Sequence, residues 1–214
     1  MKIATFGCSW THGLLEVDDG YGWPWALAER HPDWEIENFA LAGSSLSFQV
    51  LLLDDLLKNG HEYDRIVFQI TAPMRVTYFD DEYDYGKYLY RPIPNYRKFD
   101  LTGDIYHKFV CITSGHLALD RKHSFWRHPY KKYDFAQTYY TYVNKNINRV
   151  EYRALVNYVK DRVDFLYFHH EDVCGIGGIP VAMEELGTQY VADDGGHFNR
   201  EGCKVLSEWI ESHI

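Results

Sequence analysis

Short apolar runs and longer amphipathic stretches alternate along the first third of the chain. The runs at 2–7, 34–39 and 63–73 are rich in β-branched and aromatic residues, which favours strands. The stretches between them, 24–31 and 45–60, repeat apolar residues every three to four positions, as helices do. Strands linked by short helical crossovers predict a parallel sheet with helices on both faces.

Local signals mark where these elements end. Pro24 suits the first turn of a helix, where a missing N–H costs nothing. Ser45 or Ser47 can cap the next helix, and Gly60 stops it. Pro73 ends the third strand, because proline cannot donate to a sheet ladder.

The last third of the chain continues the alternation. Residues 138–162 predict an amphipathic helix, or two helices broken near 144–148. A fourth strand is expected at 163–170, followed by a loop and a short helix within 171–187. A terminal helix is expected from about Asn199. Residues 1–214 therefore read as a single α/β domain.

The middle of the chain, about 76–140, is polar and rich in tyrosine. Twelve of the 18 tyrosines fall between Tyr78 and Tyr142. We interpret the segment as an insertion over the active-site edge with one or two helices, one of them within 105–122. Two readings stay open for its tyrosines: ordinary surface packing, or a rim that stacks on sugar rings or covers an acyl group.

Composition excludes several classes of partner. The formal net charge is −9, and the densest basic region, 121–132, is short and mixed with aromatic residues, so no nucleic-acid partner is expected. No apolar run approaches membrane-spanning length, and the N-terminus does not resemble a signal peptide, so a cytoplasmic protein is expected. Free thiols are expected at the widely spaced cysteines, which are Cys8, Cys111, Cys174 and Cys203.

Two loops contain residues suited to nucleophilic catalysis. Ser9 follows the first strand in the turn Gly7-Cys8-Ser9, at the carboxyl edge of the predicted sheet. A hydroxyl attacks well only when a base takes its proton, and a histidine oriented by a carboxylate is such a base. Asp194 and His197 lie in one loop, separated by two glycines that let the backbone fold back. Asp193 is a rival for the orienting role.

These motifs resemble those of the SGNH (GDSL-like) hydrolases. The match covers a strand followed by Gly-x-Ser at 6–9, a loop glycine at Gly43 within 38–44, and Asp-x-x-His at 194–197. The resemblance implies a three-layer α/β/α sandwich with a parallel, flavodoxin-like sheet and a Ser9–His197–Asp194 catalytic set. It also implies an oxyanion hole made by the N–H groups of Ser9 and Gly43.

One motif of that family is missing. The family usually places Gly-x-Asn after the third strand, whereas this chain has no asparagine in 68–75. Thr71 is the nearest candidate for the lost donor, and Gln69 and Arg75 are others. Removing one such donor typically costs about 10²–10³ in rate.

Further residues are candidates for contact with substrate. They are Asn38, Trp10, Tyr21 and Trp23.

The other histidines and cysteines favour simpler roles. His169 and His170 are adjacent on an extended segment, so their side chains point to opposite faces and do not readily bind one ion. The remaining histidines of the middle segment have no ligand spacing. Cys8 is expected to pack beneath the Ser9 turn. We therefore expect no metal and no other cofactor.

Three functions fit these residues. The first is a serine esterase that hydrolyses small acyl esters, with O-acetyl groups of carbohydrates as the favoured substrates. The second is an acyltransferase with the same site and a glycan acceptor. The third is a glycan- or protein-binding module, catalytically impaired by the missing asparagine.

Overall fold

A parallel sheet organises the chain. The computed structural model describes residues 1–13, 21–41, 44–71, 75–79, 96–98, 109–112, 145–168, 179–180, 187–192 and 196–214. Within them the main sheet has the order β5-β2-β1-β3-β7-β8, and every neighbouring pair is parallel. These strands are β1 (Lys2–Phe6), β2 (Glu35–Asn38), β3 (Arg65–Ile70), β5 (Tyr96–Lys98), β7 (Phe165–Phe168) and β8 (Ile179–Pro180). The order from β2 to β8 is the flavodoxin-like 2-1-3-4-5 arrangement, as predicted.

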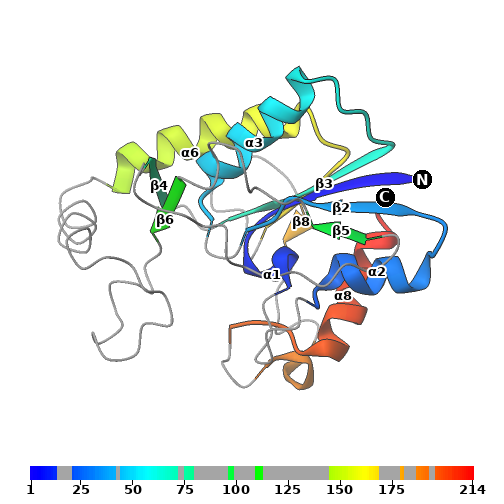
Figure 1. Cartoon of the computed structure of the whole chain (residues 1–214). Coiled ribbons are helices and arrows are strands. Elements are labelled where there is room, and N and C mark those ends of the chain that lie inside the picture. The colour runs from blue at the N-terminus through cyan, green and yellow to red at the C-terminus, as the bar shows by residue number, and fades with distance from the viewer. Residues whose placement is uncertain are drawn as a thin grey trace.

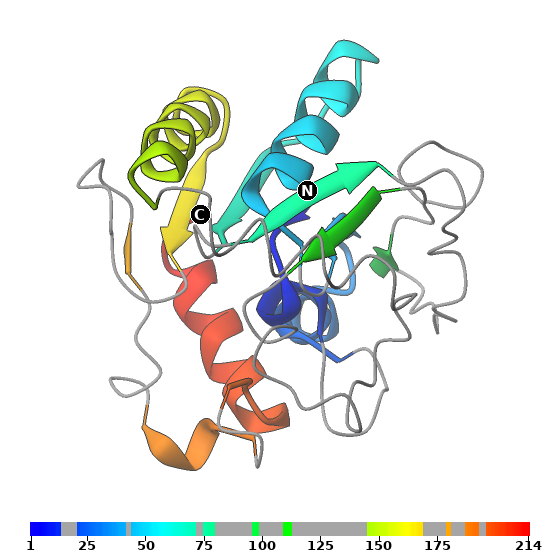
Figure 2. The same cartoon turned by 90° about the vertical axis from the view of Figure 1, so that its left-hand side faces the viewer.

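Helices cover both faces of this sheet. The long helices are α2 (Trp23–Arg30), α3 (Leu46–Lys58), α6 (Lys145–Lys160) and α8 (Arg200–Glu211). Helices α3 and α6 lie on one face and α2 and α8 on the other (Figure 1). Figure 2 shows the same three layers from a second direction. The predicted three-layer α/β/α architecture is therefore confirmed.

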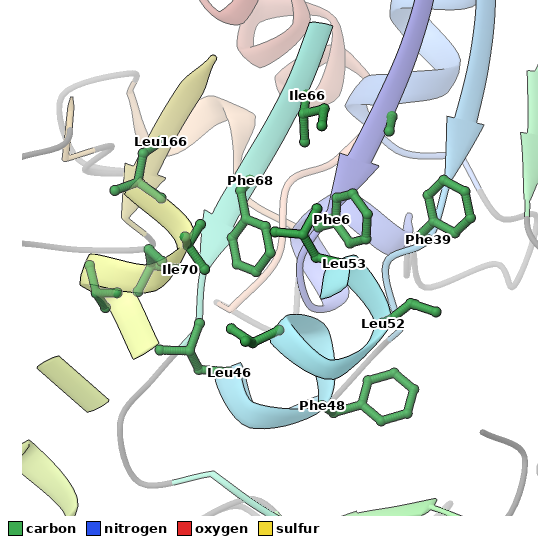
Figure 3. Close-up of a cluster of buried hydrophobic side chains, with 14 of the residues drawn as sticks. Phe6, Phe39, Leu46, Phe48, Leu52, Leu53, Ile66, Phe68, Ile70 and Leu166 are labelled. Atoms are coloured by element: carbon green, nitrogen blue, oxygen red, sulfur yellow. The ribbon is translucent and has the colours of Figure 1, made fainter. Parts of the chain in front are cut away.

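The two faces are held by separate apolar clusters, because side chains alternate along each strand. Phe6 and Phe68 point to the α3–α6 face, where they pack with Leu53 of α3 (Figure 3). Ile3 and Val67 point the other way, into the cluster under α2 and α8. Full burial of such a side chain contributes about 1.5–3 kcal/mol. These clusters fix the register of β1 and β3, and with it the position of the loops that follow them.

Several predicted element ends are confirmed. Pro24 lies in the first turn of α2. Ser45, one of the two serines considered, caps α3 by accepting a hydrogen bond from the Phe48 N–H. Asn199 caps α8 by accepting from the Gly202 N–H. Helix α6 begins at Lys145, so it is unbroken over its described length.

The middle segment differs from its prediction. Of residues 76–140, the structure describes only three strands: β4 (Val76–Phe79), β5, and β6 (Phe109–Ile112). Strands β4 and β6 form an antiparallel pair, and β5 adds to the edge of the main sheet beside β2. The helix expected within 105–122 is therefore wrong over Phe109–Ile112. The extent of the insertion stays a prediction.

Three further elements were not predicted. Strand β8 lies within 171–187, where a loop and a helix were expected. The short helix α1 (Ser9–His12) follows β1, where the sequence indicated only the turn Gly7-Cys8-Ser9. A 3-10 turn, η3 (Thr188–Tyr190), precedes the C-terminal loop.

The sheet places its switch point beside β1. The chain passes from β1 to β2 on one side and then returns to β3 on the other, so the direction of strand order reverses between β1 and β3. In open α/β sheets, ligands bind beyond the carboxyl ends of the strands at such a point. Ser9 follows β1 and Thr71 follows β3.

Among the described helices, none is long and apolar enough to cross a membrane.

Candidate active site

Ser9 is the first residue of α1, directly beyond the carboxyl end of β1. Ser9 is buried, with 7% of its residue surface exposed to solvent. Within the described part of the chain, neither its hydroxyl nor its backbone N–H has a hydrogen-bond partner. Both groups therefore remain able to interact with a bound molecule.

Two buried glutamines hold the backbone just before Ser9. The Gly7 N–H donates to Gln49 Oε1 at 3.2 Å, and the Cys8 N–H donates to Gln69 Oε1 at 3.0 Å. Cys8 itself is a fully buried free thiol, as expected of a residue packed beneath the turn. Cys203 is also a buried free thiol.

Both the backbone conformation and the close packing around residue 7 require a glycine. Its φ is +155°, and a Cβ there would lie 2.5 Å from Gln69 Oε1 and 2.6 Å from Thr11 Oγ1. Contacts below 3.0 Å are essentially never made by a real Cβ. The glycine of the Gly-x-Ser motif therefore makes room for the glutamine that binds the following N–H.

A polar chain continues inward from Gln69. Thr11 Oγ1 lies 2.8 Å from Gln69 Oε1 and 2.7 Å from the Tyr167 hydroxyl. Trp23 Nε1 donates to that hydroxyl at 3.0 Å. Burial raises the pKa of Tyr167 far above its ordinary value, so its hydroxyl stays protonated and can donate. The expectation that Tyr21 and Trp23 line a pocket is wrong, because both side chains are fully buried in the core.

The loop after β2 reaches the Ser9 loop through Ser44. Ser44 Oγ donates to the Gly7 carbonyl at 3.0 Å and accepts from Gln49 Nε2 at 2.9 Å. Gly43, the expected oxyanion donor, lies outside the described residues. Its neighbour Ser44 thus connects this loop to the turn that carries Ser9.

Asn38, expected to contact substrate, has its amide engaged within the protein. Its Oδ1 accepts from Thr5 Oγ1 and from the Ala40 N–H, each at 3.0 Å. Its Nδ2 donates to the Thr11 carbonyl at 2.9 Å. These bonds join β1, β2 and α1, so the described role of Asn38 is to tie α1 to the sheet.

Thr71 and Arg75 follow β3. Thr71 is fully buried, and its carbonyl accepts from the Tyr152 hydroxyl at 2.6 Å. Among the described residues, its hydroxyl has no hydrogen-bond partner. Arg75 is half-buried and donates through Nη1 to the Ser44 carbonyl at 3.3 Å. Their contact with substrate stays a prediction.

The C-terminal loop comes back to the Ser9 helix through Trp10. The indole Nε1 donates to the Gly196 carbonyl at 3.0 Å, and the indole ring meets Phe198 edge-on at 4.6 Å between centroids. His197 lies between those two residues and is half-buried. Trp10, expected to contact substrate, is a buried residue whose indole holds this loop, and its contact with substrate stays a prediction.

The backbone around His197 is also held from the other side. Val191 and Phe198 form an antiparallel bridge, and the Ala192 N–H donates to the His197 carbonyl at 2.8 Å. Asn199 Nδ2 donates to the Gln189 carbonyl at 2.7 Å. Asp194 and Asp193 lie outside the described residues, so their contact with His197 stays a prediction.

The structure therefore gathers Ser9, Trp10, the backbone of 196–198 and Ser44 at one edge of the sheet. Sequence reasoning missed Ser44 and Gln49, and it considered Gln69 only as a donor. One feature of the sequence could have indicated Gln49 and Gln69: each is a glutamine within an otherwise apolar strand or helix face. A buried polar side chain needs a hydrogen-bond partner, so such a residue is expected to hold a nearby polar group.

Metal chemistry receives no support from the described residues. No group of three or more of their His, Cys, Asp or Glu side chains is arranged to hold an ion. His169 and His170 lie outside them.

Comparison with known proteins gives little further information. No family model matches the chain, and no curated protein matches it. Among solved structures, the inhibitor-bound aryl esterase of M. smegmatis is similar over 100% of this chain and 99% of its own, with 14% identity and a TM-score of 0.37. A similarity of this size carries no weight for the function.

Proposed function

We propose that this protein is a serine hydrolase of small acyl esters, with Ser9 as nucleophile, His197 as general base and Asp194 as the residue that orients His197. The observation that carries the proposal is the hydrogen bond from Trp10 to the Gly196 carbonyl. It joins the residue after the nucleophile to the residue before the base. Loops from opposite ends of the chain are thereby held together at the switch point of the sheet, where ligands bind.

The proposed reaction follows from these positions. Ser9 Oγ attacks the acyl carbon while His197 accepts the hydroxyl proton. The oxyanion receives hydrogen bonds from the N–H groups of Ser9 and Gly43. The C–O bond to the alcohol then breaks, and the alcohol leaves with the proton from His197. Water, activated by His197, attacks the acyl-enzyme and releases the carboxylic acid, which restores Ser9.

Thr71 is the proposed third contributor to the oxyanion hole, in place of the missing asparagine. The support is its position at the carboxyl end of β3, the strand beside β1, together with a buried hydroxyl that has no partner among the described residues. Ser207 in α8 also has a buried hydroxyl without a described partner, so the position of Thr71 is what favours the role. Arg75 is proposed to hold the loop after β2 through its bond to Ser44 and to face the substrate.

The finer substrate assignment is O-acetyl groups on carbohydrates. Its support is the tyrosine-rich composition of 76–140, because tyrosine stacks on sugar rings. The buried rings of Trp10 and Trp23 do not add to that support.

Hydrolysis of p-nitrophenyl acetate tests the function. We expect wild-type protein to hydrolyse it and Ser9→Ala to lose at least about 10³ of the rate, as removal of such a nucleophile does. Ser207→Ala is the matched control, because Ser207 is also a buried serine but lies in α8. Equal rates for wild type and Ser9→Ala contradict the proposal. Acyl transfer to an added glycan in preference to water reassigns the same site to a transferase.

A further inference from the structure

Two glutamines from different elements converge on the turn before Ser9. Gln49 comes from α3 and Gln69 from β3, and both side chains are fully buried. Each presents Oε1 to one backbone N–H: Gln49 to that of Gly7, and Gln69 to that of Cys8. The next N–H along the chain, that of Ser9, receives no such acceptor from the described residues.

The Cys8 N–H fixes how the Gln69 amide is oriented, because an N–H can only donate and Oε1 is the acceptor atom of that amide. Thr11 Oγ1 donates to Gln69 Oε1. Its proton is then committed, so the Tyr167 hydroxyl is the donor in its bond with Thr11. Trp23 Nε1 can only donate, and it donates to Tyr167. Gln69 Oε1 thus accepts from both the Cys8 N–H and Thr11 Oγ1, whereas the buried Gln69 Nε2 has no partner among the described residues.

Gln49 acts on two loops at once. It accepts from Gly7 while its Nε2 donates to Ser44 Oγ, and Ser44 Oγ donates to the Gly7 carbonyl. This closed ring joins the turn before Ser9 to the loop that contains Gly43. Gln49 and Ser44 together therefore tie the turn before Ser9 to residue 44, which directly follows Gly43 in the sequence.

We propose that Gln69, assisted by Gln49, is a positioning residue that builds the oxyanion hole from below. The two glutamines accept hydrogen bonds from the N–H groups of Gly7 and Cys8 and so orient the peptide that follows. The Ser9 N–H is then left as the donor for the substrate oxygen. This inference rests on the proposed function. Glutamine suits the role because its neutral amide provides an acceptor without a buried charge, which would be costly.

Gln69→Met tests the role of the acceptor, because methionine fills a similar volume without one. We expect kcat for p-nitrophenyl acetate to fall about 10- to 100-fold, the effect of a small misplacement of reacting groups. KM should change less than about twofold, because the lost contact acts on the transition state. Gln69→Glu keeps an acceptor oxygen in either protonation state and should retain kcat within about fivefold of wild type.

Gln49→Met provides a second variant at a separate position, and Ser207→Ala again serves as the control. We expect Gln49→Met also to lower kcat at nearly constant KM. A folded Gln69→Met or Gln49→Met with wild-type kcat overturns the proposal. So does a Gln69→Glu variant as impaired as Gln69→Met, because an acceptor would then not be what matters.

Amide hydrogen exchange separates this inference from the function on which it rests. Protection of the Cys8 N–H should fall about tenfold or more in Gln69→Met and be retained in Gln69→Glu. That readout needs no activity. Unchanged protection in Gln69→Met overturns the positioning role, whereas equal esterase rates in wild type and Ser9→Ala remove only the catalytic assignment.

Discussion

Trp10 Nε1 donates to the carbonyl oxygen of Gly196 across 186 positions of sequence, at 3.0 Å. Trp10 stands beside the proposed nucleophile and Gly196 beside the proposed base. The indole ring also packs edge-on against Phe198, so both neighbours of His197 contact the same side chain. Trp10 thus holds the backbone on both sides of His197 against the helix that begins with Ser9.

Trp10→Phe separates the hydrogen bond from the packing. It keeps an aromatic ring against Phe198 and removes the donor to Gly196. We expect kcat to fall about tenfold through misplacement of His197, with a loss of about 0.5–1.5 kcal/mol in the free energy of unfolding. Trp209→Phe is the control, because Trp209 packs on Phe165 and its Nε1 donates to no described residue. Wild-type kcat in Trp10→Phe would contradict this role.

Gly7→Ala should be more damaging than Gly60→Ala. Both glycines have positive φ, but a Cβ at Gly60 meets nothing within 4 Å, whereas one at Gly7 lies 2.5 Å from Gln69 Oε1. Gly60→Ala should cost about 1–2 kcal/mol of stability from backbone strain alone. Gly7→Ala should cost more and lower kcat at least about 100-fold. Chemical denaturation and esterase kinetics check both values, and equal effects at the two sites would exclude the proposed steric role.

Most of the fold was predictable from the sequence because its signals are local. Strands β1, β3 and β7 are apolar runs of ordinary length, and β2 lies in a segment of alternating polar and apolar residues. Helices α2, α3 and α8 carry repeating apolar positions, and α3 and α8 have side-chain caps at their N-termini. Strands β5 and β8 are short and lie at the two edges of the sheet, where pairing rather than composition defines them. Helix α1 spans four residues, too few for a periodic pattern.

The site was predictable only in part. Ser9 and His197 belong to short motifs with fixed spacing, which a sequence displays directly. The roles of Gln49, Gln69 and Ser44 depend on contacts between residues far apart in the chain, such as Gln69 with Cys8. Such contacts leave no local pattern beyond a polar residue among apolar ones.

Thr71→Val should move stability and activity in opposite directions. Removing a buried hydroxyl that has no partner in the described part of the chain should leave the free energy of unfolding unchanged or raise it by about 1 kcal/mol. If Thr71 donates to the oxyanion, kcat should fall about 10- to 100-fold. Thr71→Ser keeps the hydroxyl and should stay near wild-type kcat. A stable Thr71→Val variant with undiminished kcat would remove Thr71 from the oxyanion hole.

Asp54 should contribute a small acid-dependent stabilisation. The hydrogen bond from Lys58, with that from Tyr158, holds the Asp54 pKa below its ordinary value. A carboxyl with a lower pKa in the folded state stabilises the fold above its unfolded pKa, and that contribution disappears as pH falls through the folded pKa.

Asp54→Asn should therefore unfold at a lower temperature than wild type at neutral pH, and the two curves should converge as pH falls through and below the lowered Asp54 pKa. The neighbouring exposed Asp55 has no ion pair or side-chain hydrogen bond with a described residue, so Asp55→Asn is the matched control. A difference between wild type and Asp54→Asn that is constant with pH would contradict the assignment.

Covalent labelling by a fluorophosphonate tests the central claim most directly, since the reagent requires an activated serine. Mass spectrometry of the digested protein locates the adduct, and His197→Ala reports whether the histidine activates it. We predict one adduct, on Ser9, with a labelling rate at least about 100-fold lower in His197→Ala. Failure of the wild-type protein to label, labelling at another residue, or equal labelling rates in His197→Ala would contradict it.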